Sequence, residues 1–170
     1  MNELTELTKE ELIELLSDAS KNWLAHDGLW FRAVEDRFGM DVALELDKKA
    51  WTRFTVVEAQ RIMKRFNLPP GGGIATLVQA LKFRLYARIN VQEISEVTQD
   101  RCVFKMKRCR VQEARIRQGL PDFPCKSVGI VEYSLFAKTI DSRIHTRCLT
   151  CPPDPHPDDV FCAWEFTLRP

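Results

Sequence analysis

The residues best suited to chemistry are concentrated between Asp141 and Pro170, which hold half of the six cysteines and two of the three histidines. Cys148, Cys151, His156 and Cys162 follow one another at spacings that differ by one residue from those of a zinc knuckle. Three thiolates and an imidazole suit a tetrahedral zinc ion, so zinc or another divalent metal is the cofactor that this pattern would allow. The alternative is that Cys148 and Cys162 are small buried residues of the core. The sequence does not otherwise identify a cofactor.

Cys125 is the best candidate for a reactive thiol. It follows the segment 122–124 at a predicted helix start, and Lys126 lies next to it. Free backbone N–H groups and a nearby cation both favour the thiolate. A nucleophilic cysteine also needs a base, which His26 or His145 could supply. The alternative is a cysteine with a purely structural role.

A second group of residues is suited to binding a small molecule. His26 and Asp27 precede Trp30, and such a cluster could line an apolar pocket with a polar end. The alternative is a helix start followed by core aromatic residues. Guanidinium groups bind carboxylates in a bidentate manner, which makes Arg110 and Arg115 candidates for a carboxylate clamp, or else part of a solvated helix face. The predicted ligand-binding set is Asp27, Trp30, Arg110, Arg115, Lys126 and Trp164.

The first half of the chain, residues 1–89, is predicted to be helical. Thr8 and Glu11 form a capping box for a helix that should run to about Leu24. Asp27 is predicted to cap a second helix that stops at Gly39. The remaining expected helices cover residues 41–67 and, after the glycine-rich turn at 71–73, a segment to about residue 89.

The second half, residues 90–170, alternates in hydrophobicity and predicts a β-β-α-α-β-β unit. The first hairpin joins Val91–Val97 to Arg101–Lys107, and the last joins Arg143–Leu149 to Val160–Leu168. We expect Cys148 to lie opposite Cys162 on the inner face. Residues 1–170 should thus form a single α+β domain, with an antiparallel sheet and helices packed on one face.

Composition limits the partners that the protein could have. A formal net charge of +1 gives no electrostatic footprint for nucleic acid. No apolar run approaches the roughly 20 residues that span a membrane. The acidic, helical start of the sequence is unlike a signal peptide, which favours a cytoplasmic location and reduced cysteines.

Several segments resemble a family of uncharacterised bacterial cytosolic proteins, notably HDGLWFRAVEDRFGMD, CRVQEARIRQGLPDFPCKSVGIVEY and CLTCPPDPHPDDVFCAWEF. That family is distantly similar to the aminothiazoline-carboxylate hydrolases. The pattern at the end of the chain is also similar to vinyl-reductase-type small-molecule-binding domains. These resemblances imply a small-molecule pocket with cysteines at its wall.

We therefore expect a cytoplasmic protein that binds a small molecule between its helices and its sheet. In an enzymatic version it would hydrolyse a cyclic amide- or thiazoline-like carboxylate, with Cys125 as nucleophile, His26 or His145 as base and an arginine as clamp. The alternative is a non-catalytic metal-binding or redox-responsive sensor domain that uses the cysteines near the end of the chain. The chain could also form a homo-oligomer.

Overall fold

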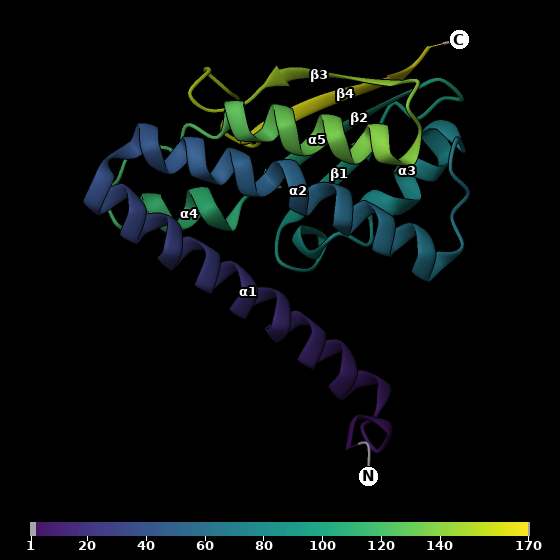
Figure 1. The fold of residues 1–170 in the computed structure, drawn as a ribbon, viewed down its shortest axis with the longest axis horizontal. Helices are drawn as coiled ribbons and strands as arrows, with labels where there is room; N and C mark the ends of the chain where they lie inside the picture. Colours follow the sequence, from purple (N-terminus) through teal and green to yellow (C-terminus); the bar gives the residue numbers. More distant parts are fainter. Residues whose placement is uncertain (1–2, 170) are drawn as a thin grey trace.

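The computed structural model describes residues 3–169 as a mixed helical and sheet structure (Figure 1). The helical elements are η1 (Glu3–Thr5), α1 (Lys9–Phe38), α2 (Met40–Phe66), α3 (Gly73–Leu81), η2 (Leu85–Arg88), α4 (Arg110–Arg117) and α5 (Lys126–Ile140). The strands are β1 (Val91–Ser95), β2 (Arg101–Arg108), β3 (Ile144–Thr150) and β4 (Cys162–Leu168). Within residues 3–169, no helix is both long and apolar enough to cross a lipid bilayer.

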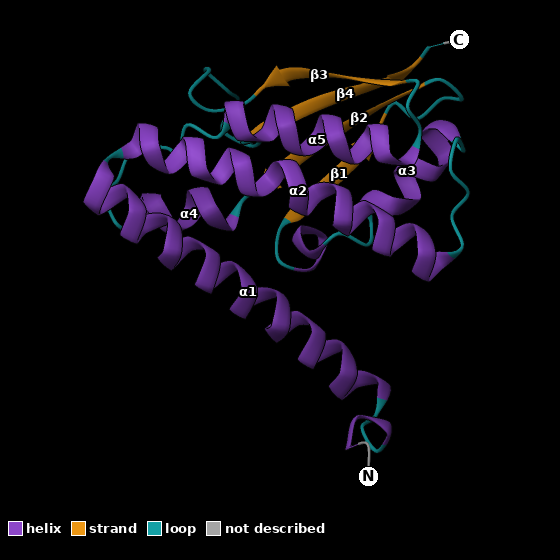
Figure 2. Ribbon diagram, viewed as in Figure 1, coloured by secondary structure: helices purple, strands orange, loops and turns teal. Residues whose placement is uncertain are grey.

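The four strands form one antiparallel sheet in the order β1-β2-β4-β3. Helix α5 packs on one face of this sheet, α2 packs on α5, and α1 packs on α2 (Figure 2). Charged residues such as Arg147 and Glu165, joined at 2.8 Å, lie on the opposite face. The predicted α+β class, with a helix-rich first half, is confirmed.

Large apolar side chains fill the space between α5, α3 and the sheet. Phe104 and Phe136 are each no more than 1% exposed, and Phe166 is fully buried. Cys102 and Met106 face the same side as Phe104, as the alternation in this strand predicted. The main core therefore lies under the inner face of the sheet.

The register of the last hairpin differs by two residues from the predicted one. Cys148 pairs with Trp164 rather than with Cys162, and the ladder is irregular just after Cys148. Strand β4 begins at Cys162 and not at the predicted Val160. It lies in the centre of the sheet, where its pairing with β2, including that of Cys162 with Met106, fixes its position. A shift of two residues keeps every side chain on its predicted face, so Cys162 and Trp164 remain buried.

Helix α1 is continuous, so the predicted second helix start at Asp27 is wrong. The helix runs from the confirmed capping box at Thr8 to Phe38 without a break. Trp23 stacks on Phe54 at 5.5 Å, and Phe31 meets Phe123 at 4.8 Å. These contacts on both sides of Asp27 fix one straight helix, and tertiary packing overrides the local capping signal.

Two further helix boundaries differ from the sequence-based ones. The helix expected to reach residue 89 ends at Leu81 and is followed by a turn and η2. Helix α5 begins at Lys126, so Cys125 is its N-cap and not a residue of its first turn.

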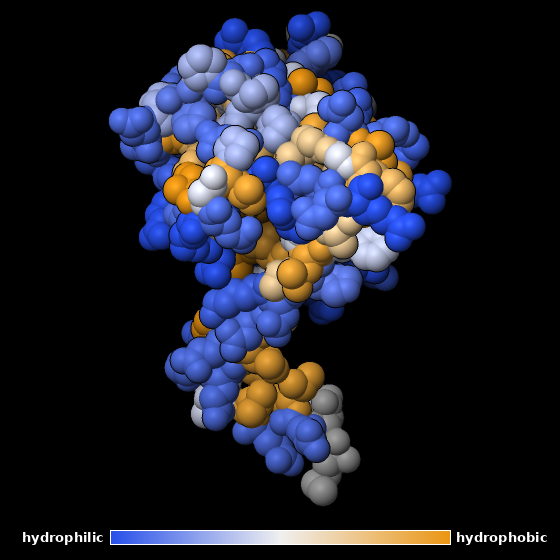
Figure 3. Space-filling view, turned by 90° about the vertical axis from the view of Figure 1, so that its left-hand side faces the viewer, coloured by the Kyte–Doolittle hydropathy of each residue, from blue (hydrophilic) through white to orange (hydrophobic). Residues whose placement is uncertain are grey.

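The first turns of α1 extend away from the rest of the molecule (Figures 1 and 3). Leu12 and Leu16 are 40% and 50% exposed there, on the side of the helix that further along carries Trp23. Trp23 is where this apolar stripe meets the body, through contacts with Trp51, Phe54 and Tyr86.

Candidate functional site

A cavity of about 480 Å³ lies between helices α1, α2, α4 and α5 and the inner face of the sheet. We call it the central cavity. Its volume falls within the range of small-molecule sites. Six aromatic side chains contribute to its wall: Phe31, Trp51, Tyr86, Phe123, Tyr133 and Trp164.

One side of α5 provides a wall of the central cavity. Cys125, Val128, Gly129, Glu132 and Tyr133 all line it. Their spacing of three and four residues places them on one helix face. Cys125 and Glu132 are seven residues apart, which corresponds to about 10 Å along the helix axis. A thiol and a carboxyl group therefore lie toward opposite ends of the same wall.

Trp164 closes this wall from the sheet side. A Cβ on Gly129 would come within 2.7 Å of Trp164 Cζ2, so the helix and the indole ring touch only because residue 129 is glycine. The ring also stacks on Tyr133 at 4.8 Å. Its indole N–H is buried and has no hydrogen-bond partner within the described residues.

Three carboxyl groups from three helices gather at the central cavity, and we call them the carboxyl cluster: Asp27 of α1, Asp47 of α2 and Glu132 of α5. Burial raises the pKa of Asp27 and of Glu132. Burial, followed by the charges of Asp27 and Glu132, raises the pKa of Asp47 to about 7. Desolvation and like charge both disfavour the ionised forms, so the cluster is poised to accept positive charge.

The nearby buried cation is already engaged. Arg84 donates to Glu58 at 2.9 Å and lies 2.7 Å from Glu132, the second contact being poorly aligned for a hydrogen bond. Asp27 and Asp47 form no salt bridge with any residue between 3 and 169. The cluster therefore keeps two carboxyl groups without a cationic partner.

The predicted arginine clamp is only partly available. Arg115 is bound to Glu35 at 3.0 and 3.3 Å and to the Pro121 carbonyl at 2.9 Å, so it holds α1 and α4 together and is not free for a ligand. Arg110 and Arg117 are exposed, line the central cavity and have no side-chain partner in the described part of the chain.

Thiols occupy the wall of the central cavity around the start of α5: Cys109, Cys125, Cys151 and Cys162. Cys125 Sγ and Cys151 Sγ are 3.6 Å apart. Hydrogen bonding to the sulfurs of Cys125 and Cys162, together with burial, raises the pKa of Cys151 well above its ordinary value. Burial raises the pKa of Cys109 to about 12.

Gln112 of α4 positions the segment that carries Cys125. Its side chain accepts from the Phe123 N–H at 2.8 Å and donates to the Phe123 carbonyl at 2.9 Å. The same Nε2 lies 3.6 Å from Cys125 Sγ. A single buried amide thus fixes the backbone before the thiol and places a donor beside the sulfur.

The structure does not bring the predicted bases together with Cys125. His145 is exposed on the face of β3 shared with Arg147, which is the outer face of the sheet. His26 is exposed on α1, although its neighbour Asp27 lines the central cavity. Trp30 is 69% exposed and does not contribute to the wall.

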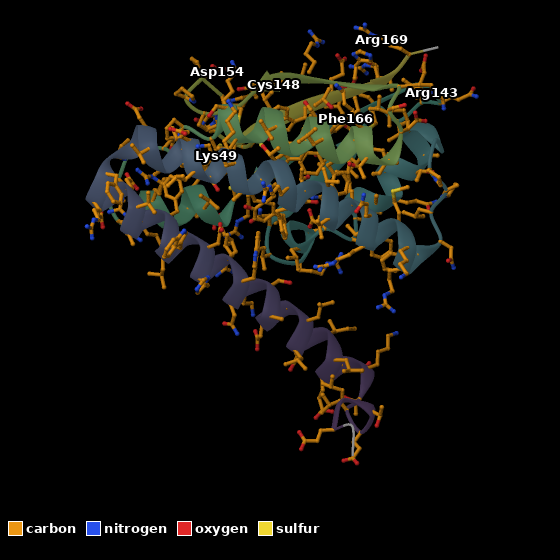
Figure 4. The ribbon with its side chains drawn as sticks, in the orientation of Figure 1. Lys49, Arg143, Cys148, Asp154, Phe166 and Arg169 are labelled. Atoms are coloured by element: carbon orange, nitrogen blue, oxygen red, sulfur yellow. The ribbon has the colours of Figure 1, made fainter. Side chains whose placement is uncertain are left out.

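The predicted metal ligands do not assemble into a site. Within residues 3–169 no group of three or more His, Cys, Asp or Glu side chains is arranged to hold a metal ion. His156 Nε2 lies 3.4 Å from Asp122 and its ring contacts Phe161. Cys148 is half-buried and does not line the central cavity, and it lies at the same end of the sheet as Asp154 (Figure 4). The close cysteine pair joins Cys151 to Cys125, which the zinc-knuckle spacing did not include.

Sequence reasoning missed Asp47, Gln112 and Glu132. One signal was present for Glu132, which is four residues after Val128 and four before Phe136 and so shares a helix face with both. An acidic residue on an apolar helix face is uncommon unless it is paired or functional. The signal for Asp47 was weaker: it lies four residues before Trp51 and so shares a helix face with an aromatic residue.

The chain matches the model of a known protein family. A model described as "Family of unknown function (DUF6125)" matches residues 5–168. The chain belongs to this family. The DUF6125 match spans every residue of the carboxyl cluster and every thiol of the central cavity.

Membership of an uncharacterised family, which the sequence motifs indicated, is thus confirmed. The likeness to aminothiazoline-carboxylate hydrolases and to vinyl-reductase-type domains stays a prediction. No curated protein matches the chain.

Proposed function

We propose that this DUF6125 protein binds a small organic molecule with an apolar body and a protonated amine in the central cavity. The observation that carries the proposal is the carboxyl cluster. Three acids from three helices face a largely aromatic cavity, and two of them lack a cationic partner among residues 3–169.

The physical reason is the cost of ionising these acids when the cavity is empty. Burial raises the pKa of each member of the cluster, so a neighbouring cation would favour the carboxylate form. An ammonium group beside Asp27 and Asp47 supplies that charge. The aromatic rings of Trp51 and Tyr86, stacked at 5.7 Å, offer a surface for the apolar body and for cation–π attraction.

A second polar group on the ligand is supported by the basic side of the cavity. Arg110 and Arg117 are exposed and unpaired within the described residues, and guanidinium groups bind carboxylates well. A ligand with an amine near the carboxyl cluster and a carboxylate near α4 would use both. The ligand would thus carry the carboxylate group expected from the sequence, but Arg110 and Arg117 would bind it, and Arg115 would not.

The proposal concerns binding, and hydrolysis is a separate step. Cys125 lines the cavity, but neither histidine predicted as its base lies on the cavity wall. If a bound cyclic carboxylate were converted to a released product, the protein would be a hydrolase as well as a binding protein. The cytoplasmic location expected from the sequence stays a prediction, as does any homo-oligomer.

Thermal unfolding with three probes of similar shape tests the proposal: phenethylamine, 2-phenylethanol and 3-phenylpropionate. At pH 8 we expect phenethylamine to raise the melting temperature most, because ligands that bind only the folded state stabilise it. Asp47→Asn should remove the advantage of the amine. Asp158→Asn changes an exposed acid outside the cavity and should keep it. Equal stabilisation of the wild-type protein by phenethylamine and 2-phenylethanol would refute the role of the carboxyl cluster.

A further inference from the structure

Two cysteines from distant parts of the chain are held together at the wall of the central cavity. Cys125 Sγ and Cys151 Sγ are 3.6 Å apart, although the residues are separated by helix α5 and strand β3. The Lys126 N–H donates to the Pro152 carbonyl at 2.9 Å, and Lys126 Nζ pairs with Asp154 at 2.7 Å. The residues that directly follow each cysteine therefore fasten the loop to the start of α5.

The two thiols differ in access. Cys125 is half-buried and lines the central cavity, whereas Cys151 is only 1% exposed. The side chain of Gln112, itself 1% exposed, places an N–H donor 3.6 Å from Cys125 Sγ. Burial and hydrogen bonding raise the pKa of Cys151, which therefore stays protonated longer. Cys125 has the character of an attacking thiol and Cys151 that of a resolving thiol.

We infer that Cys125 and Cys151 form a reactive dithiol that is oxidised by low-molecular-weight disulfides entering the central cavity. The inference does not depend on the proposed amine ligand, because it rests on the sulfur geometry and on Gln112.

The reaction consists of two thiol–disulfide exchanges. The Cys125 thiolate attacks one sulfur of a disulfide RSSR, the S–S bond breaks, and RS⁻ leaves and takes up the proton that Cys125 lost. Cys151 then loses its proton and attacks the Cys125 sulfur of the mixed disulfide. A second RSH is released, and the protein retains one Cys125–Cys151 bond in place of two S–H groups. The external disulfide is reduced to two thiols.

The fold allows the final step with a small movement. A disulfide bond brings the sulfurs to about 2 Å, so they must approach by roughly 1.5 Å. Cys125 is fixed by Gln112 and the start of α5, whereas Cys151 lies in the connection between β3 and β4. The contacts of Lys126 hold the two segments together, so the sulfurs can approach without separating the loop from α5.

The test uses the full chain and bis(2-hydroxyethyl) disulfide, a neutral probe that does not depend on the carboxyl cluster. Reduced protein is incubated with the probe, alkylated and mapped without reduction. We expect the wild-type protein to lose two hydrogens and to yield a peptide pair linked through Cys125 and Cys151. Cys151→Ser should stop at a mixed disulfide on Cys125, and Cys125→Ser should form neither product at residue 151. Cys148→Ser alters a cysteine outside the cavity and should behave like the wild type.

Two results would overturn the inference. One is a wild-type link between Cys151 and Cys162 that forms equally fast in Cys125→Ser, because Cys125 would then take no part. The other is wild-type protein in which Cys125 and Cys151 stay reduced while Cys148 reacts. Circular dichroism of each variant establishes that it is folded. If Cys125→Ser does not fold, Gln112→Leu is used instead, and the rate at which Cys125 forms the mixed disulfide is measured. A rate equal to that of the wild type would contradict the proposed role of Gln112 beside Cys125.

Discussion

Asp47 shows how several elements together set the chemistry of one side chain. It lies on α2, yet the charges that raise its pKa belong to Asp27 on α1 and Glu132 on α5, after the larger effect of burial. A pKa of about 7 in the folded state, against an ordinary value of 3.8, means that the folded protein holds the proton more tightly than the unfolded chain. Ionisation of Asp47 therefore costs stability as the pH rises from about 4 to above 7.

Replacing this acid should remove the cost. We expect Asp47→Asn to unfold with a free energy about 1–2 kcal/mol higher than the wild type at pH 8, and with little difference at pH 4. Urea unfolding at the two pH values measures both quantities. A variant that is less stable than the wild type at pH 8 would show that Asp47 is ionised and stabilising in the folded state.

Two helical glycines give a matched pair of substitutions. In Gly129→Ala the new Cβ meets Trp164 at 2.7 Å, and overpacking of this kind costs about 1–3 kcal/mol. In Gly28→Ala the new Cβ has no neighbour within 4 Å, and the gain in helix propensity should stabilise the protein by about 0.5–1 kcal/mol. Thermal denaturation should therefore give shifts of opposite sign. A Gly129→Ala variant that is as stable as the wild type, or more stable, would mean that α5 and the indole ring are not in contact.

At the residue scale, the sequence identified residues whose amino-acid type alone indicates a chemical role. Cys125, Asp27 and Trp164 were singled out, and all three line the central cavity. Asp47 and Glu132 were not, because a carboxylate on a helix is usually solvated, and the apolar neighbours of Glu132 on its helix face were not weighed against that expectation. The positions of the predicted bases were not predictable for a similar reason. His26 and His145 do not line the central cavity, and the local sequence of His145 does not show its exposure or its face of the sheet.

At the scale of elements, Arg84 links α2 to α5 through buried ion pairs. It is 1% exposed, pairs with Glu58 and Glu132, and lies 4.7 Å from the Phe136 ring. Glu58 also accepts from the Leu85 N–H at 3.1 Å, which fixes the start of η2. The ion pairs hold the helices in the positions that define one side of the central cavity.

Removing the arginine should be costly because two buried carboxylates lose their partner. We expect Arg84→Met to lower the free energy of unfolding by about 3–5 kcal/mol. Arg147→Met, which breaks an exposed pair with Glu165 on the outer face of the sheet, should cost no more than about 1 kcal/mol. Chemical denaturation of both variants gives the comparison, and equal losses would contradict the assignment of Arg84 as the buried link.

Element types were predictable from the sequence, whereas their ends and pairings were less so. Hydrophobic alternation identified both hairpins, but the register of β3 against β4 depends on how β4 pairs with β2. The break predicted at Asp27 followed a valid local rule, and the aromatic contacts of Trp23 and Phe31 overrode it. Long-range packing decided each of these differences.

At the scale of the whole molecule, the two halves of the chain meet at the central cavity. Helices α1 and α2 of the first half supply Asp27 and Asp47, and the second half supplies Glu132, the thiols and the sheet. The expectation of a site between helices and sheet came from a resemblance, and no single segment of sequence encodes it. The cavity exists only when both halves have folded against each other.

The most direct test of this account is the affinity of phenethylamine for the folded protein, measured by isothermal titration calorimetry at pH 6 and pH 8. The probe stays protonated over this range, so the change in affinity reports on the protein. Because the pKa of Asp47 is about 7, its ionised fraction rises about tenfold between the two pH values. We predict that the dissociation constant falls by a comparable factor at pH 8, and that Asp47→Asn loses this dependence. An affinity that is the same at both pH values in the wild-type protein, or no binding at either, would contradict the proposed amine site.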